Sequence, residues 1–221
     1  MASARISRLP LPPASDTRLL DDHRFHALLP DADWGRLPVA IWRRFSKRLG
    51  DGKTVVYVGE VEEAGFSPIG WWVAQIARVI GGPLPTGCDT GVPMIVTVTE
   101  DAASGGQIWT RICACRDGFP QVIHSAKRFA GPTGLEEYVG FGVSMALRIC
   151  VEHEALVFRS VGYSLQFGSL RLPLPEWLTP GDIRVTHSDL GGGTFRFTLD
   201  VVHPRFGMLV RQSAVFVEAA S

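Results

Sequence analysis

Apolar and polar residues alternate over most of the chain after Pro93, with the two-residue period of β-strands. The links between the alternating segments are short and rich in turn-forming residues, as in Asp117-Gly118 and Gly191–Gly193. Because parallel strands need long crossovers, these links predict antiparallel neighbours. Nine segments are expected to be strands: Pro93–Thr99, Gln107–Cys115, Gln121–Phe129, Tyr138–Val151, Ala155–Tyr163, Leu165–Leu172, Ile183–Ser188, Thr194–His203 and Met208–Glu218.

The N-terminal part of the chain mixes helical and strand periods. Asp21–Leu29 predicts a short helix. A second helix is expected to begin after Leu37, with Pro38 in its first turn and Gly50 as its stop. Lys53–Glu62 alternates as a strand.

The most apolar helix is expected over Pro68–Ile80, directly after Ser67. It is too short to span a bilayer. Trp71 broadens its apolar stripe, so we expect this helix to be buried on much of its circumference. The stripe has helical spacing and consists of Ile69, Trp72, Val73, Ile76 and Ile80.

Together these elements predict an α+β fold. A large curved antiparallel β-sheet or partly closed barrel, of about 8–10 strands, is expected to pack around the Pro68–Ile80 helix, with further helices at the N-terminus. The long Tyr138–Val151 strand has one bulky and one small face, which is typical of strong curvature. Leu172–Leu178 interrupts the strands as an apolar lid or corner. We expect residues 1–20 to be a flexible lead-in and residues 21–219 to form a single domain.

Composition and charge narrow the classes of function. The chain has 221 residues, of which 46% are apolar and 20% charged, as in ordinary globular proteins. Its 22 Lys and Arg residues balance 22 Asp and Glu residues, so we expect no nucleic-acid partner. The basic helix face at Arg43–Arg48 leaves open a contact with a membrane surface or a phosphate. No continuous apolar segment marks a secretory signal, so a cytoplasmic location without a transmembrane segment is expected.

The sequence contains no recognisable metal or cofactor motif. Its histidines show no H-x-x-x-H or H-E-x-x-H spacing, and His23 with His26 would supply only half a metal site. Cys113 and Cys115 fall on one strand face, which suits neither a C-x-x-C redox turn nor a pair of metal ligands. Walker, Rossmann and G-x-S-x-G patterns are also missing from the sequence. We therefore expect neither a metal nor a cofactor.

Polar and titratable residues gather between Gly106 and Gly142, where a sheet should bury its side chains. Arg111 shares a strand face with Trp109, and a buried guanidinium needs a partner. Glu137 or Glu136 is the nearest candidate in the sequence. Two interpretations remain open: an ion pair that stitches the sheet, or an Arg that clamps a ligand carboxylate or phosphate.

His124 shares a strand face with Val122, Ala126 and Arg128. The near-neutral pKa of a histidine allows acid–base chemistry, with Glu137 as a possible partner. Ser125 points to the opposite face of the same strand, so a nucleophilic Ser–His pair has poor geometry.

Several modest motifs follow one another in a characteristic order along the chain: Trp109 with Arg111 on one strand, Ser125 on the next, Glu137 before Gly140, then Leu172–Pro175 and finally Leu209-Val210. In this order the chain resembles the bacterial domain of unknown function 4166, over roughly Phe25 to Glu218. That family is sometimes fused behind a saccharopine-dehydrogenase-like reductase, so the resemblance implies at most a partnership with such an enzyme. It implies no activity.

The leading hypothesis is a domain that binds an apolar or amphipathic small molecule in a cavity of the curved sheet. Polar contacts would come from one end of the cavity. The candidate ligand-binding residues are Trp109, Arg111, His124, Ser125, Arg128 and Glu137.

Two other hypotheses make different structural predictions. A cofactor-independent isomerase, cyclase or hydrolase would use His124 and Glu137 as acid and base, and both would face one cavity. An interaction module would dock onto a reductase through Leu172–Leu178, and Trp177 would then be exposed to solvent and would not line a pocket.

Overall fold

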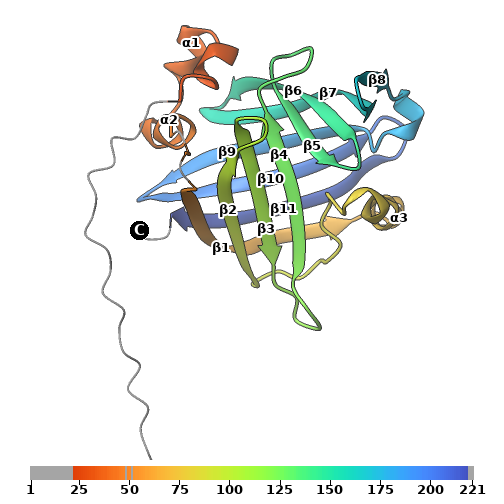
Figure 1. The fold of residues 1–221 in the computed structure, drawn as a ribbon. Coiled ribbons are helices and arrows are strands. Elements are labelled where there is room, and N and C mark those ends of the chain that lie inside the picture. Colours follow the sequence, from red (N-terminus) through yellow and green to blue (C-terminus); the bar gives the residue numbers. More distant parts are fainter. Residues whose placement is uncertain (1–21, 48, 51, 219–221) are drawn as a thin grey trace, which may run out of the picture.

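The chain folds mainly into a closed antiparallel β-barrel, shown in Figure 1 for the computed structural model. The structure describes residues 22–47, 49–50 and 52–218. Within these residues, ten strands follow one another around the barrel in the order β6-β5-β4-β3-β2-β1-β11-β10-β9-β7. Pairing of β6 with β7 closes the circle, and β8 extends β7 alone.

All neighbouring strands run antiparallel, as the short links predict. Strand β7 pairs with β6 along one edge, and along its other edge it pairs first with β9 and then with β8. The strands are β1 (Thr54–Phe66), β2 (Pro93–Asp101), β3 (Gly106–Cys113), β4 (Gln121–Arg128), β5 (Glu136–Gly140), β6 (Val143–Glu152), β7 (Ala155–Phe167), β8 (Leu170–Pro173), β9 (Asp182–Gly191), β10 (Thr194–His203) and β11 (Gly207–Glu218).

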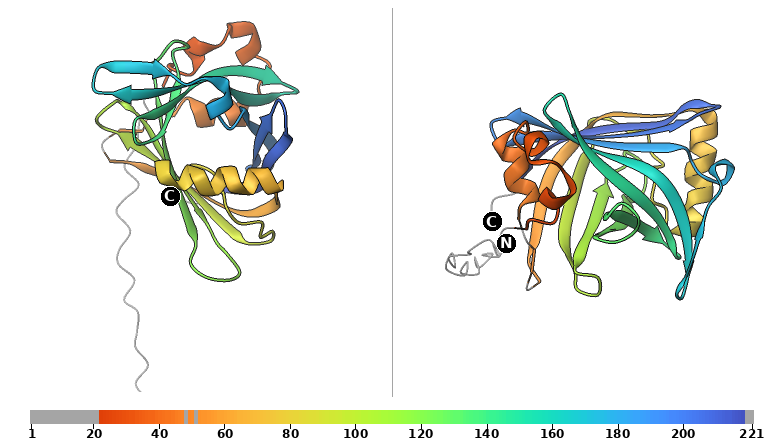
Figure 2. Two further views of the ribbon diagram at one scale, coloured as in Figure 1. Left: turned by 90° about the vertical axis from the view of Figure 1, so that its right-hand side faces the viewer. Right: turned by 90° about the horizontal axis from the view of Figure 1, so that it is seen from above.

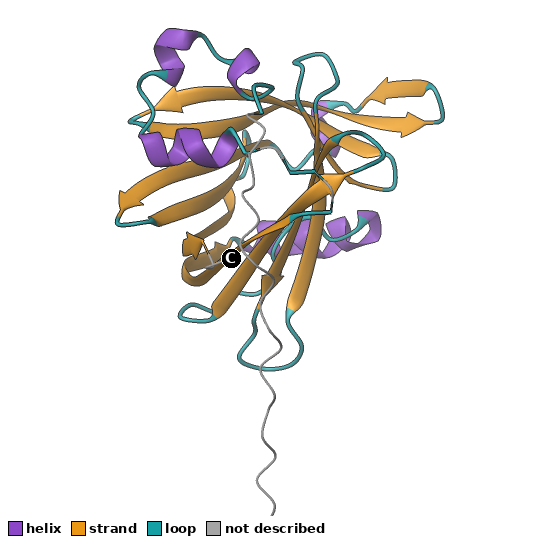
Figure 3. Ribbon diagram, turned by 60° about the vertical axis from the view of Figure 1, so that its left-hand side comes forward, coloured by secondary structure: helices purple, strands orange, loops and turns teal. Residues whose placement is uncertain are grey.

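Short helices lie at the two ends of the barrel, as the purple ribbons of Figure 3 show. At one end lie α1 and α2, and at the other lies α3, so that the two views of Figure 2 show them on opposite sides of the strands. The helices are η1 (His26–Leu28), α1 (Asp31–Trp34), α2 (Val39–Phe45), α3 (Pro68–Ala77), η2 (Arg78–Ile80) and η3 (Glu176–Leu178).

The N-terminal helices close their end of the barrel with a dense apolar core. Phe25 is fully buried, and its ring meets the rings of Phe45, Phe129 and Phe158 edge-on. Such edge-to-face pairs add to the stabilisation from burying apolar area. Ile41 of α2 is also fully buried in this cluster. This end of the barrel is therefore plugged.

The helix α3 lies along the rim of the other end and not inside the sheet (Figure 2), so the expectation that the sheet packs around it was wrong. Only Gly70 and Ala74 of this helix are buried, and they face β11. Trp72 and Ile76 of the predicted apolar stripe are 63% and 67% exposed. The expected burial of most of the helix was therefore also wrong. The fold is mostly β and not α+β, and the expected curved antiparallel sheet closes fully into a barrel.

The predicted Tyr138–Val151 strand is in fact two strands, β5 and β6, that form a tight hairpin. The turn contains Gly140, Phe141 and Gly142, which all have positive φ angles (122°, 48° and 80°). Glycine adopts this backbone region without the steric cost of a Cβ. The small residues that suggested a curved strand therefore mark a chain reversal.

Several element boundaries follow the sequence. Pro68 begins α3, and the N–H of Gly70 donates to Ser67 Oγ at 3.0 Å as an N-cap. The helix expected after Leu37 is α2, although it ends at Phe45 and not near Gly50. In place of the expected Asp21–Leu29 helix, the structure has only η1, and both Asp21 and the lead-in at residues 1–20 lie outside the described residues.

Replacing Gly70 by Ala should loosen α3 from the barrel. A Cβ at this position would lie 1.8 Å from the carbonyl oxygen of Leu209, so the helix must move away from β11. We expect a loss of about 1–3 kcal/mol in the free energy of unfolding, measured by chemical denaturation. Gly65→Ala is the matched control, because a Cβ there meets nothing within 4 Å. Equal stability of the two variants would contradict the packing of α3.

Candidate functional site

The barrel encloses a cavity of about 620 Å³ that extends toward the end carrying α3. Its inner boundary is aromatic and includes Trp109, Phe197 and Phe216. Most of its other lining is aliphatic, and the lining at the α3 end comes from α3 and η3. The cavity is therefore an apolar space with one plugged end and one end bordered by short helices.

The charged residues that line this cavity lie together on the wall made by β3, β4 and β5. Ser125 Oγ donates to Glu137 Oε1 at 2.6 Å, and Lys127 Nζ donates to Glu137 Oε2 at 3.1 Å. Arg111 donates to Ser125 Oγ at 3.1 Å and lies 3.4 Å from Glu137 Oε1. These four side chains form what we call the polar cluster.

Strand register brings the polar cluster together. Trp109 lies opposite Ser125 in the β3–β4 pair, and Lys127 lies opposite Glu137 in the β4–β5 pair. Arg111 is two residues beyond Trp109 and therefore shares its inward face. Three neighbouring strands thus deliver their polar side chains to one patch of the interior.

The polar cluster keeps its carboxylate ionised. Burial raises the pKa of Glu137, but the charges of Lys127 and Arg111 and the hydrogen bond from Ser125 outweigh this effect and hold the pKa at about 2. Burial lowers the pKa of Lys127, and Glu137 opposes this shift. The ammonium group also lies 4.9 Å from the centroid of the Trp109 ring. With all three groups ionised, the cluster carries a formal charge of +1.

Two of the candidate residues lie on the outside of the barrel. His124 is exposed, and its Nδ1 lies 3.0 Å from Thr110 Oγ1. Arg128 stacks over the ring of Tyr138 at 4.1 Å and lies 3.7 Å from Asp101. Placing His124 and Arg128 among the cavity residues was therefore wrong, because both occupy outward positions of β4.

The outward position of His124 also contradicts the geometry that the acid–base hypothesis requires. His124 and Glu137 lie on opposite sides of the barrel wall, so they do not share a cavity. Ser125 faces the interior while His124 faces outward, which agrees with the strand alternation.

Lys127 is the residue of the site that the candidate set lacked. Its side chain is only 5% exposed and contacts Glu137 directly. The signal was available in the sequence, because Lys127 follows Ser125 by two residues and so shares its strand face. A lysine on a strand more often occupies a solvent-facing position, and for this reason Lys127 was not among the candidate residues.

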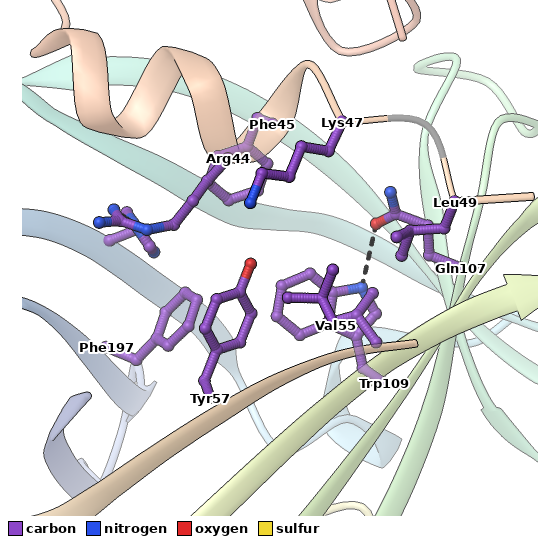
Figure 4. A pocket seen from close by; sticks show the side chains of 11 residues that line it. Arg44, Phe45, Lys47, Leu49, Val55, Tyr57, Gln107, Trp109 and Phe197 are labelled. Atoms are coloured by element: carbon purple, nitrogen blue, oxygen red, sulfur yellow. Dashed lines mark hydrogen bonds between the residues drawn. The ribbon is translucent and has the colours of Figure 1, made fainter. Parts of the chain in front are cut away.

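The plugged end holds a second, much smaller space of about 20 Å³, shown in Figure 4. This volume suits one water molecule. Trp109 and Phe197 line both spaces and separate them. The indole N–H of Trp109 points into the small space and donates to Gln107 Oε1 at 3.2 Å.

Neither space offers a metal site. Among residues 22–218, apart from residues 48 and 51, no three His, Cys, Asp or Glu side chains gather closely enough to hold a metal ion. His187 is fully buried beside the small space, and burial together with the charge of Arg44 keeps its pKa well below the usual value. Its Nε2 lies 3.0 Å from Arg44 Nη1, and its ring stacks on Phe195.

Exposed apolar side chains surround the cavity at the α3 end. Trp177 is 76% exposed and also lines the cavity. The interaction hypothesis predicted that Trp177 would be exposed and would not line a pocket. The exposure is confirmed, and the second part of the prediction is wrong. The exposed lining residues are Ile76, Phe141, Trp177 and Leu178, and we call them the apolar rim.

Comparison with known protein families matches residues 37–216 to the family described as Domain of unknown function (DUF4166). The chain belongs to this family. The matched DUF4166 region contains the whole polar cluster and the strands that form it. No curated protein and no solved structure matches the chain. Within the described part of the chain, no helix is long and apolar enough to cross a membrane.

Glu137→Gln should destabilise the protein in a pH-dependent way. The folded-state pKa of Glu137 lies below its ordinary value of 4.5, so its stabilisation is present above about pH 4.5 and is lost as the pH falls toward about 2. We expect the variant to be less stable at pH 7 by about 3 kcal/mol, with the difference shrinking in acid.

Denaturant unfolding at a series of pH values measures this effect. Glu62→Gln is the control, because the Glu62–Arg196 ion pair is exposed and should contribute less than about 1 kcal/mol. A Glu137→Gln deficit that persists unchanged at low pH would show that the carboxylate charge is not its cause.

Proposed function

We propose that this DUF4166 domain binds an apolar or amphipathic small molecule inside its barrel. The observation that carries the proposal is the cavity itself. Its volume of about 620 Å³ lies within the range of roughly 300–1,000 Å³ that small-molecule pockets occupy. Its lining combines many apolar side chains with a few convergent polar groups, which is the usual composition of such pockets.

The two ends of the barrel support this proposal in different ways. The N-terminal helices fill one end with buried aromatic side chains, including Phe25 and Phe45. The other end is bordered by α3 and η3, whose lining residues are partly exposed. A ligand would therefore enter past the apolar rim and stop at the aromatic boundary formed by Trp109 and Phe197.

The state of Glu137 favours binding over acid–base catalysis. A general base works best when its pKa lies near the operating pH. Glu137 has a pKa of about 2, so it is a weak base, and both of its carboxylate oxygens already accept hydrogen bonds, from Ser125 and Lys127. Such a carboxylate serves better to hold neighbouring cations in place.

Filling the cavity should weaken binding. Leu199 lines the cavity, and Leu199→Trp would place a larger side chain inside it. We expect the wild-type protein to bind the neutral apolar dye Nile red, with enhanced fluorescence, and the variant to bind it at least tenfold more weakly. Native mass spectrometry of both proteins would detect any co-purified molecule.

Thr198→Trp is the matched control. Thr198 is the preceding residue of β10 and does not line the cavity, so the same new side chain would lie on the other face of the strand. Binding by this variant should equal that of the wild type. Failure of the wild type to bind the dye, or equal binding by all three proteins, would contradict an internal site.

A further inference from the structure

We propose that the ligand is an anionic amphiphile whose carboxylate or phosphate group lies against Arg111 inside the barrel, with its apolar chain directed toward the apolar rim. This inference rests on the proposed function and names the class of molecule that the cavity takes. It also assigns the ligand an orientation, with the head group inside.

The first argument is the charge of the cavity wall. Among the described residues that line the cavity, the charged ones are Arg111, Lys127 and Glu137. Glu137 neutralises one of the two cations, so one positive charge faces an apolar interior without a matching anion on the wall. A ligand that fills the cavity removes Arg111 from water, and only a ligand that brings an anion to it avoids the cost of an uncompensated buried charge.

The second argument is that the two cations of the polar cluster differ in their distance from Glu137 and in their exposure. Lys127 lies 3.1 Å from Glu137, and its side chain is 5% exposed, so this pair is packed closely against the wall. Arg111 lies farther from the carboxylate, at 3.4 Å, and its side chain is 22% exposed. Arg111 is therefore the cation that remains accessible from the cavity.

The third argument is the hydrogen-bonding capacity of Arg111. A guanidinium group has five N–H donors in a planar fork. The structure gives its side chain two acceptors: Nη1 donates to Ser125 Oγ, and Nη2 donates to Glu137 Oε1. The remaining donors suit the two oxygens of a carboxylate or phosphate, which a guanidinium binds in a bidentate manner.

The surroundings of the polar cluster set the orientation of the ligand. The cluster adjoins the aromatic boundary, since the ammonium group of Lys127 lies over the ring of Trp109. The rim carries apolar side chains such as Phe141 and Trp177. A head group at Arg111 thus leaves the apolar chain of the ligand to pack along the aliphatic walls and reach the rim.

A neutral molecule of the same length would fill the apolar space but leave the charge of Arg111 unmatched. The cavity should therefore prefer a long-chain fatty acid to its methyl ester, although both present the same hydrocarbon. We expect the acid to displace bound Nile red from the wild-type protein with an affinity at least tenfold higher than that of the ester. An alkyl phosphate of equal chain length distinguishes a preference for phosphate from one for carboxylate.

Substitution of Arg111 should remove this preference. In Arg111→Gln, Lys127 and Glu137 still neutralise each other, so the barrel wall keeps a balanced ion pair. We expect the affinity for the acid to fall on the order of tenfold, while that for the ester stays unchanged. Arg128→Gln removes the same charge from the outside of the neighbouring strand and should leave both affinities as in the wild type.

The possible results separate this inference from the proposed function. If wild-type protein binds the dye but takes acid, phosphate and ester equally, the anionic class is wrong and the internal site stands. If Arg111→Gln binds the acid as tightly as Arg128→Gln does, Arg111 does not hold the head group. If wild-type protein binds neither dye nor any of the three amphiphiles, the proposed function itself fails.

Discussion

The pairing of β6 with β7 is the constraint on which the rest of the molecule depends, because it turns a long antiparallel sheet into a closed ring. The pairing runs along the whole of β6, from Val143 opposite Leu165 to Glu152 opposite Ala155. On its outer side, Glu152 binds both Arg159 and Arg184 and so links three strands. Closure removes the unpaired strand edges of the barrel and creates an inside, where side chains from opposite walls face one another.

An interior of this kind changes the chemistry of the polar residues that it contains. On an open sheet, Arg111 and Lys127 would be solvated and their attraction to Glu137 would be weak. Within the barrel, the same attraction is strong enough to depress the pKa of the carboxyl against the effect of burial. The polar cluster is therefore a product of the fold and not of its three neighbouring strands alone.

Local periodicity accounts for the parts of the structure that could be predicted from the sequence. Alternation correctly placed Ser125 and His124 on opposite faces, and N-cap chemistry correctly began α3 at Pro68. The barrel order could not be predicted, because it depends on which distant strands pair. The position of α3 was misjudged because an apolar helical stripe predicts a contact surface without identifying what covers it. The Gly140–Gly142 turn was missed because glycines within an alternating segment also fit a bulge or bend.

The two ends of the barrel differ in how firmly they are held. The N-terminal plug joins many fully buried aromatic and aliphatic side chains, so opening it requires disruption of the main core. The helix α3 buries Gly70 and Ala74, and Val73 and Ala77 pack partly against the same small cluster. Regions with few buried contacts open at a small fraction of the global unfolding cost. Local opening is therefore expected at the α3 end, beside the cavity, and not at the plugged end. Substitutions beneath α3 can therefore change how often this end opens while the buried core of the plugged end stays intact, so the two ends can evolve partly independently.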